Sequence, residues 1–572
     1  MSVACVLTLG VPRARADTYE WQRMERALRA NGLELAGLPE GKRIAWIRVL
    51  RDDVFVKDEV WPQFLNWFHM TTREQVVRRE LLFNEGDVYR EARIEETMRN
   101  LRGMEIFALV RIVPIKVPDS DAVGVLVQTR DLWSLRLETG FDISTIVDQL
   151  VVRLTERNFL GRNKALSVSF ELLPLNHWLT QSYVARRVWG STVQLSQSAG
   201  IVINNASSNA EGAVGTLQFG EPYYNLKQRF AWVAAGTYQD FIARQLVLRK
   251  LTTFSDPALG ADGPHGDRVW RQRDATAAAV ANLRFGTFYK QTWGAGWDFR
   301  SVSAHATSET MLVPALRDVF EQKVLPRGRR EVGPTFSYDI LMPEFRRFQN
   351  LATFGQTENV RIGPTASLSV RVPLRAFGSN TNSYVFTSAV GCILAPGGFL
   401  LEGSVGGRTR YEAEQLVDQR FSALVRGATP VLFRSFRFVS RVALTARRND
   451  TANTYVALGA SQGLRGYTSQ YFHGYGASSL LANFEVRSLP FLAWQAVHVG
   501  GVMFFDTGTV YNQLSQLQMH YAMGLGLRVL FPQFNRMPFS FDAGAGFDPS
   551  FRIVPTIEDA QVVPLTAVED PK

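Results

Sequence analysis

Cysteines, long apolar runs and paired histidines are all scarce in this sequence of 572 residues. The two cysteines, Cys5 and Cys392, are too few for a disulfide scaffold or a cysteine-based zinc site. The best apolar stretch, Phe491–Phe505, contains Gln495 and His498 and falls short of the roughly 18 apolar residues that a membrane-spanning helix needs, which excludes a helical membrane protein. The histidines have no metal-site spacing, so neither a metal nor a cofactor is expected.

Acidic residues are outnumbered by basic ones, 53 against 63, which gives a formal charge of +10. With 46% hydrophobic and 20% charged residues, the chain is too apolar to be disordered. A positive balance of this size is typical of proteins that bind nucleic acid or anionic lipid, and of pores lined by arginine. Composition alone does not separate these classes.

The first residues have features of an exported protein. Ser2–Val11 is apolar, and Ala14-Arg15-Ala16 is a small-x-small cleavage pattern before Asp17, which predicts a signal peptide over residues 1–16. The basic segment that usually precedes the apolar run is absent, so a frayed terminus is the alternative reading. Residues 17–40 are expected to be a linker.

A small α+β unit is predicted over residues 41–130. Its elements, in order, are a strand at Arg43–Leu50, a helix opened by the capping box Thr71-Thr72-Arg73-Glu74 and running to about Leu82, a helix at Arg90–Leu101, and strands at Glu105–Val113 and Val123–Gln128.

This β-α-α-β-β order resembles a POTRA domain, the periplasmic module of outer-membrane assembly and transport proteins. The resemblance implies that the strand after the two helices offers its free edge to an extended client chain by β-augmentation. The residues of this edge are Ile106, Phe107, Ala108, Leu109 and Val110.

From Asp131 to Lys572 apolar residues alternate with small or polar ones. In one example Tyr521, Met523, Leu525, Leu527, Val529 and Phe531 alternate with Ala522, Gly524, Gly526 and Arg528. Several segments are near the 9–11 residues of a tilted membrane-spanning strand. The pattern predicts a membrane all-β fold, an antiparallel transmembrane β-barrel of about 16 strands at roughly 25–30 residues for each strand with its connection. A large soluble sandwich is the alternative.

Two polar segments, Thr253–Asp274 and Ala304–Glu331, are expected to be long loops on the extracellular side. At the C-terminus, Phe551–Ile557 is expected to form a short final strand, because prolines flank or interrupt it, and Thr566–Lys572 a polar tail. The seam between the first and last strands is therefore expected to have the fewest hydrogen bonds in the barrel.

The most specific motif lies near the C-terminal end of the predicted barrel. It consists of Gly463, Leu464, Arg465, Gly466 and Tyr467, followed by Glu485 in one strand and by Phe504-Phe505-Asp506-Thr507-Gly508 in the next. It resembles the loop motif and the strand motif that follows it in the BamA/TamA superfamily of outer-membrane assembly proteins. Asn158-Phe159-Leu160-Gly161 resembles the hairpin that the family has near the barrel start. A buried guanidinium needs partners, and its planar fork suits carboxylates, so Glu485 and Asp506 are predicted to hold Arg465 inside the barrel.

An enzyme is not expected. The segment Gly459–Gly463 matches G-x-S-x-G, but it lies at a strand end that enters the Arg465 loop, without the strand–turn–helix context of a nucleophile elbow. The basic cluster Arg327–Arg330 is expected to face lipopolysaccharide phosphates or water, and no nucleic-acid partner is expected.

Two functions remain open at this stage. The resemblance implies a protein of the bacterial outer membrane, with its POTRA-like domain in the periplasm, that assists insertion or translocation of client proteins. Its partners would be unfolded or nascent clients, outer-membrane lipid and lipopolysaccharide, and accessory periplasmic proteins. The alternative is an outer-membrane pore or channel, porin-like or similar to two-partner-secretion transporters, in which the small domain is a structural or docking module.

Overall fold

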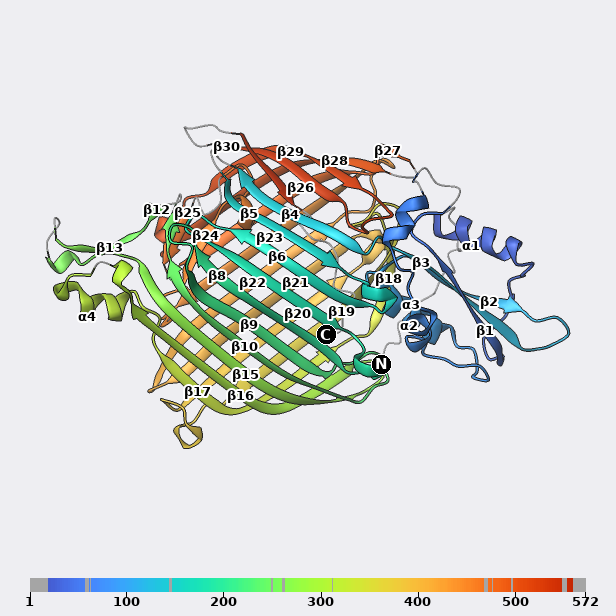
Figure 1. Cartoon of the computed structure of the whole chain (residues 1–572), viewed down its shortest axis with the longest axis horizontal. Helices are drawn as coiled ribbons and strands as arrows, with labels where there is room; N and C mark the ends of the chain where they lie inside the picture. The colour runs from blue at the N-terminus through green and yellow to red at the C-terminus, as the bar shows by residue number, and fades with distance from the viewer. Residues whose placement is uncertain are drawn as a thin grey trace, which may run out of the picture.

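The computed structural model describes residues 19–56, 61, 63–143, 147–247, 250–259, 263–310, 312–467, 472–475, 477–494, 497–547 and 553–558. A small α+β domain lies at one end of a large antiparallel β-barrel (Figure 1). The predicted signal peptide and the polar tail lie outside the described residues. None of the described helices is both long and apolar enough to cross a membrane.

The N-terminal domain has the element order that the sequence predicts. The elements are β1 (Ile44–Asp52), α2 (Glu74–Arg79), α3 (Glu91–Arg102), β2 (Phe107–Lys116) and β3 (Val123–Asp131). The strand order is β1-β3-β2, with β1 parallel and β2 antiparallel to β3. Ile94, Met98 and Leu101 of α3 recur on one helix face and pack with Val125 and Val127 of the central strand.

The expected linker over residues 17–40 is wrong, because Tyr19–Ala30 forms helix α1. Met24 and Leu28 lie one turn apart on the same helix face and are buried against Ile115 and Leu126. Alternate residues of β2 and β3 would otherwise leave an apolar sheet face in water. The helix is therefore part of the domain, covering the sheet face opposite α3.

The predicted capping box is also wrong. Helix α2 begins at Glu74 with Arg73 as its N-cap residue and has no side-chain cap. The Thr72 hydroxyl instead donates to Asp131 Oδ2 at 2.9 Å, and Asn158 Nδ2 donates to Thr72 Oγ1 at 2.9 Å. The capping box placed the helix start at Thr71. The hydroxyl of the neighbouring Thr72 makes a tertiary contact with Asp131 instead, and no side chain caps α2.

Antiparallel strands form the barrel wall, and the sheet closes on itself. The strands are β4 (Leu135–Ile143), β5 (Val147–Glu156), β6 (Lys164–Leu172), β7 (Asn176–Ala185), β8 (Gln194–Asn204), β9 (Ala210–Glu221), β10 (Phe230–Arg244), β15 (Val269–Phe285), β16 (Lys290–Ala306), β17 (Arg329–Leu341), β18 (Glu344–Gln349), β19 (Thr357–Arg371), β20 (Ser383–Leu394), β21 (Leu400–Glu412), β22 (Gln415–Ala428), β23 (Phe436–Arg448), β26 (Ser478–Ser488), β27 (Leu492–Ala493), β28 (His498–Tyr511), β29 (His520–Leu530), β30 (Phe539–Gly546) and β31 (Ile553–Glu558).

The expected number of about 16 strands is too low. Within the described residues 22 segments join the closed sheet. Two of them, β18 and β27, are short pieces beside β19 and β28, while β17 pairs directly with β19 and β26 with β28. The estimate failed because many connections are tight: only Ala413 and Glu414 separate β21 from β22.

The large apolar residues face outward, as alternation predicts for a barrel in lipid. In β29, Met523 is 51% and Leu525 63% exposed, whereas Ala522 and Arg528 are buried. A soluble sandwich would bury the large residues instead. The small and charged residues therefore face the lumen.

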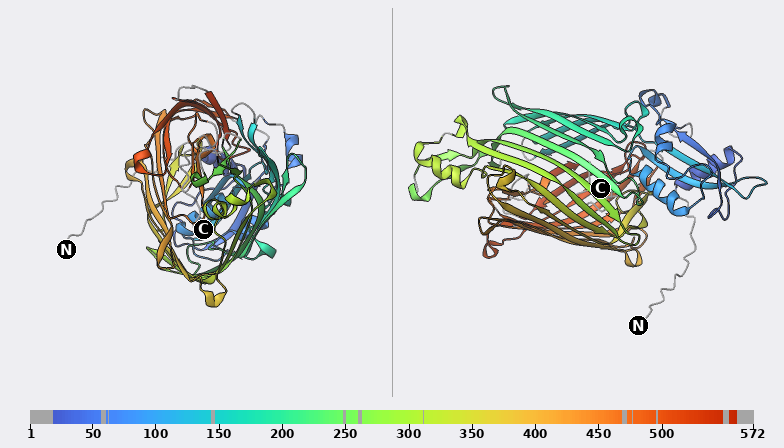
Figure 2. Two further views of the ribbon diagram at one scale, coloured as in Figure 1. Left: turned by 90° about the vertical axis from the view of Figure 1, so that its left-hand side faces the viewer. Right: turned by 90° about the horizontal axis from the view of Figure 1, so that it is seen from below.

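The two ends of the barrel differ, and we call them the domain end and the cap end (Figures 1 and 2). At the cap end β13 (Thr253–Ser255), β14 (His265–Asp267) and α4 (Pro314–Lys323) form a small cluster in which Phe254 and Phe320 pack edge to face. The expected long loops are thus partly ordered: β15 starts inside the first, and α4 lies inside the second.

The N-terminal domain is held firmly at the domain end. Glu80 next to α2 forms a bidentate ion pair with Arg187, at 2.8 and 2.9 Å. Glu96 and Asn100 of α3 bond to the backbone of the β9–β10 turn, at Leu226 N and Tyr224 O.

A second set of junction contacts surrounds Asp131, where β3 leads into β4. His69 lies with Nε2 2.9 Å from Asp131 Oδ2 and Nδ1 3.2 Å from Ser134 Oγ. Burial raises the pKa of the Asp131 carboxyl, against the hydrogen bonds from His69 and Thr72. The Asn158–Gly161 turn joins this network, because Arg73 N donates to Gly161 O at 2.9 Å.

Candidate functional site

A loop from the cap end of the barrel folds back against the inner wall. It lies between β23 and β26 and contains the hairpin β24 (Tyr455–Leu458) and β25 (Phe472–Tyr475). Leu464, Arg465 and Tyr467 are all at most 4% exposed. The loop is anchored by apolar packing of Leu464 and Tyr467 with Leu481 and Ala522 of the wall.

Arg465 contacts carboxylates from three neighbouring parts of the wall. Its Nε and Nη2 donate to the two oxygens of Asp506 in β28, at 2.7 and 2.9 Å. Its Nη1 lies 2.8 Å from Glu485 in β26 and 3.1 Å from Asp542 in β30. The structure thus brings together the arginine and both carboxylates that the sequence analysis names, and adds a third.

The site is balanced in charge. Arg487 pairs with Glu485 at 2.6 Å, and Arg528 pairs with Asp542 at 2.6 Å. Together with Arg465 and Asp506 they make three arginines and three carboxylates, all at most 7% exposed. A buried charge is tolerated only when it is paired and hydrogen-bonded, so each member depends on the others.

Neutral side chains complete the lumen site. The Arg465 guanidinium stacks 3.7 Å from the centre of the Phe504 ring. Asn483 donates from Nδ2 to Asp506 Oδ1 and to Gly463 O, both at 2.8 Å. The face that Asp506 shares with Phe504 is therefore the lumen face, and alternate Met503, 62% exposed, faces outward.

Glycines allow the loop to approach the wall. Gly466 has φ of +89°, and a Cβ there would lie 2.9 Å from the Ala545 carbonyl carbon. Tyr467 donates its hydroxyl to Tyr521 O at 2.9 Å and lies against Gly546, where a Cβ would come within 2.6 Å of its ring. Larger residues at either glycine would push the loop away.

Sequence reasoning missed Asp542, Arg487 and Arg528. A signal for Asp542 was present: Phe539 and Phe541 alternate with it and face the other side of the strand. The two arginines alternate in the same way with outward residues such as Leu527.

The predicted client edge maps to the start of β2, an edge strand of the small sheet. Phe107, Leu109 and Val110 are 1% exposed and Ile106 is 3%, so their side chains belong to the core, while Ala108 lies at a bulge. Part of the edge is occupied, because Ala36 N donates to Pro114 O and Lys116 N to Glu34 O. The residues of β2 before Pro114 take no part in these backbone bonds at the edge.

The described residues show neither a metal-ligand cluster nor a nucleophile elbow at these sites. Among the described residues, no group of three or more His, Cys, Asp or Glu side chains is placed to hold a metal ion. The G-x-S-x-G segment forms the 3-10 turn η8 (Ala460–Gln462), which leads into the Arg465 loop, and a nucleophile elbow needs a helix there.

No family model matches the chain. A candidate outer membrane protein assembly factor of Treponema pallidum (strain Nichols) is 27% identical over 128 residues, which are 21% of this chain and 15% of that protein. The chain thus matches only a small part of this relative's length.

Solved structures that are similar to this chain have lower identity to it. BamA from Haemophilus ducreyi lacking POTRA domains 1-3 has 12% identity and a TM-score of 0.36, covering 90% of this chain and 84% of that one. CdiB from Acinetobacter baumannii has 11% identity and a TM-score of 0.43, covering 90% and 73%. CdiB from Escherichia coli has 12% identity and a TM-score of 0.42, covering 92% and 79%.

Proposed function

We propose that this protein, which resembles the BamA/TamA superfamily in its domain order and lumen motif, assists insertion or translocation of client proteins at the bacterial outer membrane. The observation that carries the proposal is the weak seam between the last barrel strand, β31, and the first, β4. It lies beside an N-terminal domain in which β2 has a partly free edge. Within the described residues β31 and β4 share two paired positions, Thr556 with Asp142 and Ile557 with Phe141. The neighbouring pairing of β4 with β5 has nine.

A membrane location is supported by the outer surface. Exposed aromatic residues gather at the turns of the domain end, as expected for an interfacial girdle. They are Phe159, Trp189, Phe288, Phe433, Phe491 and Trp494. In this proposal the N-terminal domain is periplasmic, the cap end faces outside, and lipid and lipopolysaccharide surround the wall.

The kind of client follows from the unpaired backbone groups at the strand edges. An extended, unfolded chain has backbone groups that can pair first with β2 and then with the edges exposed when the seam opens. The matching segment of the Treponema relative, described as an assembly factor, supports the same reading. No catalytic step and no cofactor form part of the proposal.

The strand edge provides a first prediction. In β2, Val110 O, Pro114 O and Lys116 N point away from β3, because they bond to Arg102, Ala36 and Glu34. Val110→Pro should therefore remove an edge N–H and leave the β2–β3 ladder intact. Losing one backbone bond of about 1 kcal/mol should lower photocrosslinking of clients from position 108, which is half-buried at the bulge, about fivefold.

Val110→Ala is the matched control for this measurement, since it shortens the same side chain and keeps the N–H. Equal crosslinking in both variants would exclude client pairing at this edge.

Deletion of the gene separates the two candidate functions. Quantitative proteomics of the outer membrane and the medium should show a defined set of barrel or secreted proteins lost. An unchanged proteome together with altered uptake of small solutes would replace the proposal with a pore.

A further inference from the structure

Three arginines lie directly opposite one another across neighbouring strands near the cap end. Arg408 of β21 pairs in register with Arg420 of β22, which pairs with Arg447 of β23. They point into the lumen, since the adjacent Phe421 is 45% exposed on the outer face. Like charges opposite one another across a sheet are destabilising, so this row needs an explanation.

Carboxylates do not neutralise the row. Among the described residues none forms an ion pair with Arg408, Arg420 or Arg447, although Arg447 donates to Thr454 Oγ1. The nearest acids have other partners: Asp418 binds Arg329 at 2.9 Å and Arg410 at 3.1 Å, and Glu331 also pairs with Arg410.

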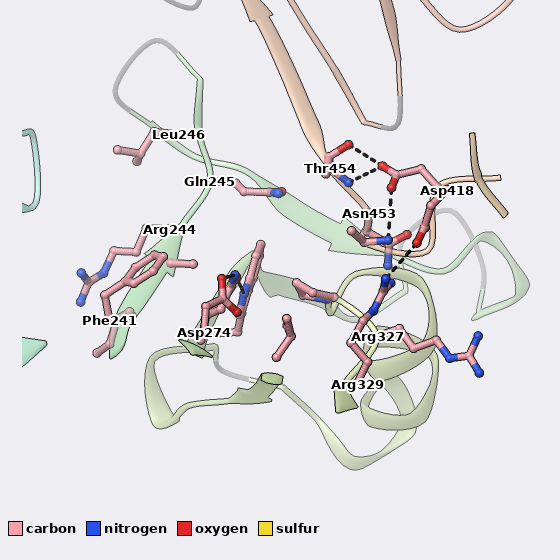
Figure 3. Close-up of a pocket in the computed structure, with 18 of the residues that line it drawn as sticks. Phe241, Arg244, Gln245, Leu246, Asp274, Arg327, Arg329, Asp418, Asn453 and Thr454 are labelled. Carbon is pink, nitrogen blue, oxygen red and sulfur yellow. Dashed lines mark hydrogen bonds and ion pairs between the residues drawn. The ribbon is translucent and has the colours of Figure 1, made fainter. Parts of the chain in front are cut away.

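The row lines a lumen cavity of about 800 Å³. Other residues of the lining are labelled in Figure 3. Arg329 and Asp418 bond to each other on one side of it, and Phe241 and Asp274 lie on the other. Arg300, also in the lining, has no ion pair among the described residues. Against these four arginines the lining offers two carboxylates without an arginine partner, Asp274 and Asp450, so the cavity is electropositive.

We propose that this cavity binds a compact multivalent phosphate anion, either free or as the headgroup of a phosphorylated glycolipid. Guanidinium forks match phosphate oxygens and bind them bidentately. Neighbouring strands are about 4.8 Å apart, so adjacent arginines can share one diphosphate. Carboxylates on one face of an extended acidic peptide would be about 6.6 Å apart and fit this spacing less well.

The test is thermal unfolding of the detergent-solubilised full chain with sodium pyrophosphate, against sodium chloride at equal ionic strength. Pyrophosphate should raise the Tm by about 3 °C. Arg420→Gln should abolish this rise, because it breaks the row at its centre. Without anion the same variant should be at least as stable as the wild type, since it removes like-charge repulsion.

Arg434→Gln is the matched control, because Arg434 is exposed at the β22–β23 turn of the domain end and its loss removes the same charge outside the cavity. It should keep the full rise. Mixed micelles containing bis-phosphorylated lipid A provide a second arm: a rise there as well assigns the site to a headgroup, and a rise with pyrophosphate alone assigns it to a free anion.

Three results would overturn the proposal. One is the absence of any rise with either phosphate compound. Another is an equal rise in the Arg420→Gln variant, which would indicate an adventitious ion only. The third is a larger rise with oligoglutamate than with pyrophosphate, which would make the cavity a site for acidic peptide.

Discussion

Arg465→Ala is expected to leave the barrel embedded in the membrane but much less resistant to unfolding, and inactive in client assembly. The substitution removes a guanidinium that contacts Asp506, Glu485 and Asp542, and leaves an uncompensated negative charge at a buried site. Breaking a buried pair from one side costs about 3–5 kcal/mol. The measurement is the temperature at which the folded band disappears on unheated gels, together with client levels in the outer membrane.

The double variant Arg465→Ala with Asp506→Asn separates charge from loop position. It restores the balance between the remaining arginines and carboxylates, so it should regain part of the heat resistance. Function should stay low, because the loop still lacks its anchor. Wild-type heat resistance and wild-type client levels in the single variant would show that Arg465 is needed neither for stability nor for client assembly.

Much of this site could be predicted, because it depends on local pattern and simple chemistry. Arg465 lies between two glycines, and alternation puts Glu485 on the same strand face as Asn483, which also reaches the site. Asp506 was harder, since the lumen face of β28 also carries Phe504 and Val502. Only the structure shows why an apolar residue lies on the lumen face: the Phe504 ring stacks on the Arg465 guanidinium.

The kind of fold could be predicted, but the predicted number of strands and several predicted details were wrong. Alternation predicts strands facing lipid, but strand number depends on connection length, which alternation does not report. Thr71 has the sequence of a helix start, yet α2 has no side-chain cap, and the neighbouring Thr72 donates its hydrogen bonds to Asp131, which is distant in sequence. Helix α1 was missed because Met24 and Leu28 gain their burial only from a sheet that forms later in the chain.

A disulfide across the seam is expected to block client assembly reversibly. Asp142 and Thr556 are paired in the backbone register of β4 and β31, so Asp142→Cys with Thr556→Cys should crosslink in a background without Cys5 and Cys392. Opening this seam costs few backbone bonds, at roughly 1 kcal/mol net each, although an edge left unpaired in lipid costs more. A covalent bond removes that route, and reductant should restore client levels.

Ser182→Cys with Ser198→Cys is the matched control, because these residues face each other between β7 and β8 in a pairing of ten positions. If clients pass only through the seam, a crosslink there should change nothing, since that part of the wall never needs to open. Full activity of the crosslinked seam variant would exclude lateral opening, and the route for clients would then have to run through the lumen past Arg465. Because the loop closes part of that lumen, the two crosslinks and the Arg465→Ala variant together distinguish a lateral gate from a central channel.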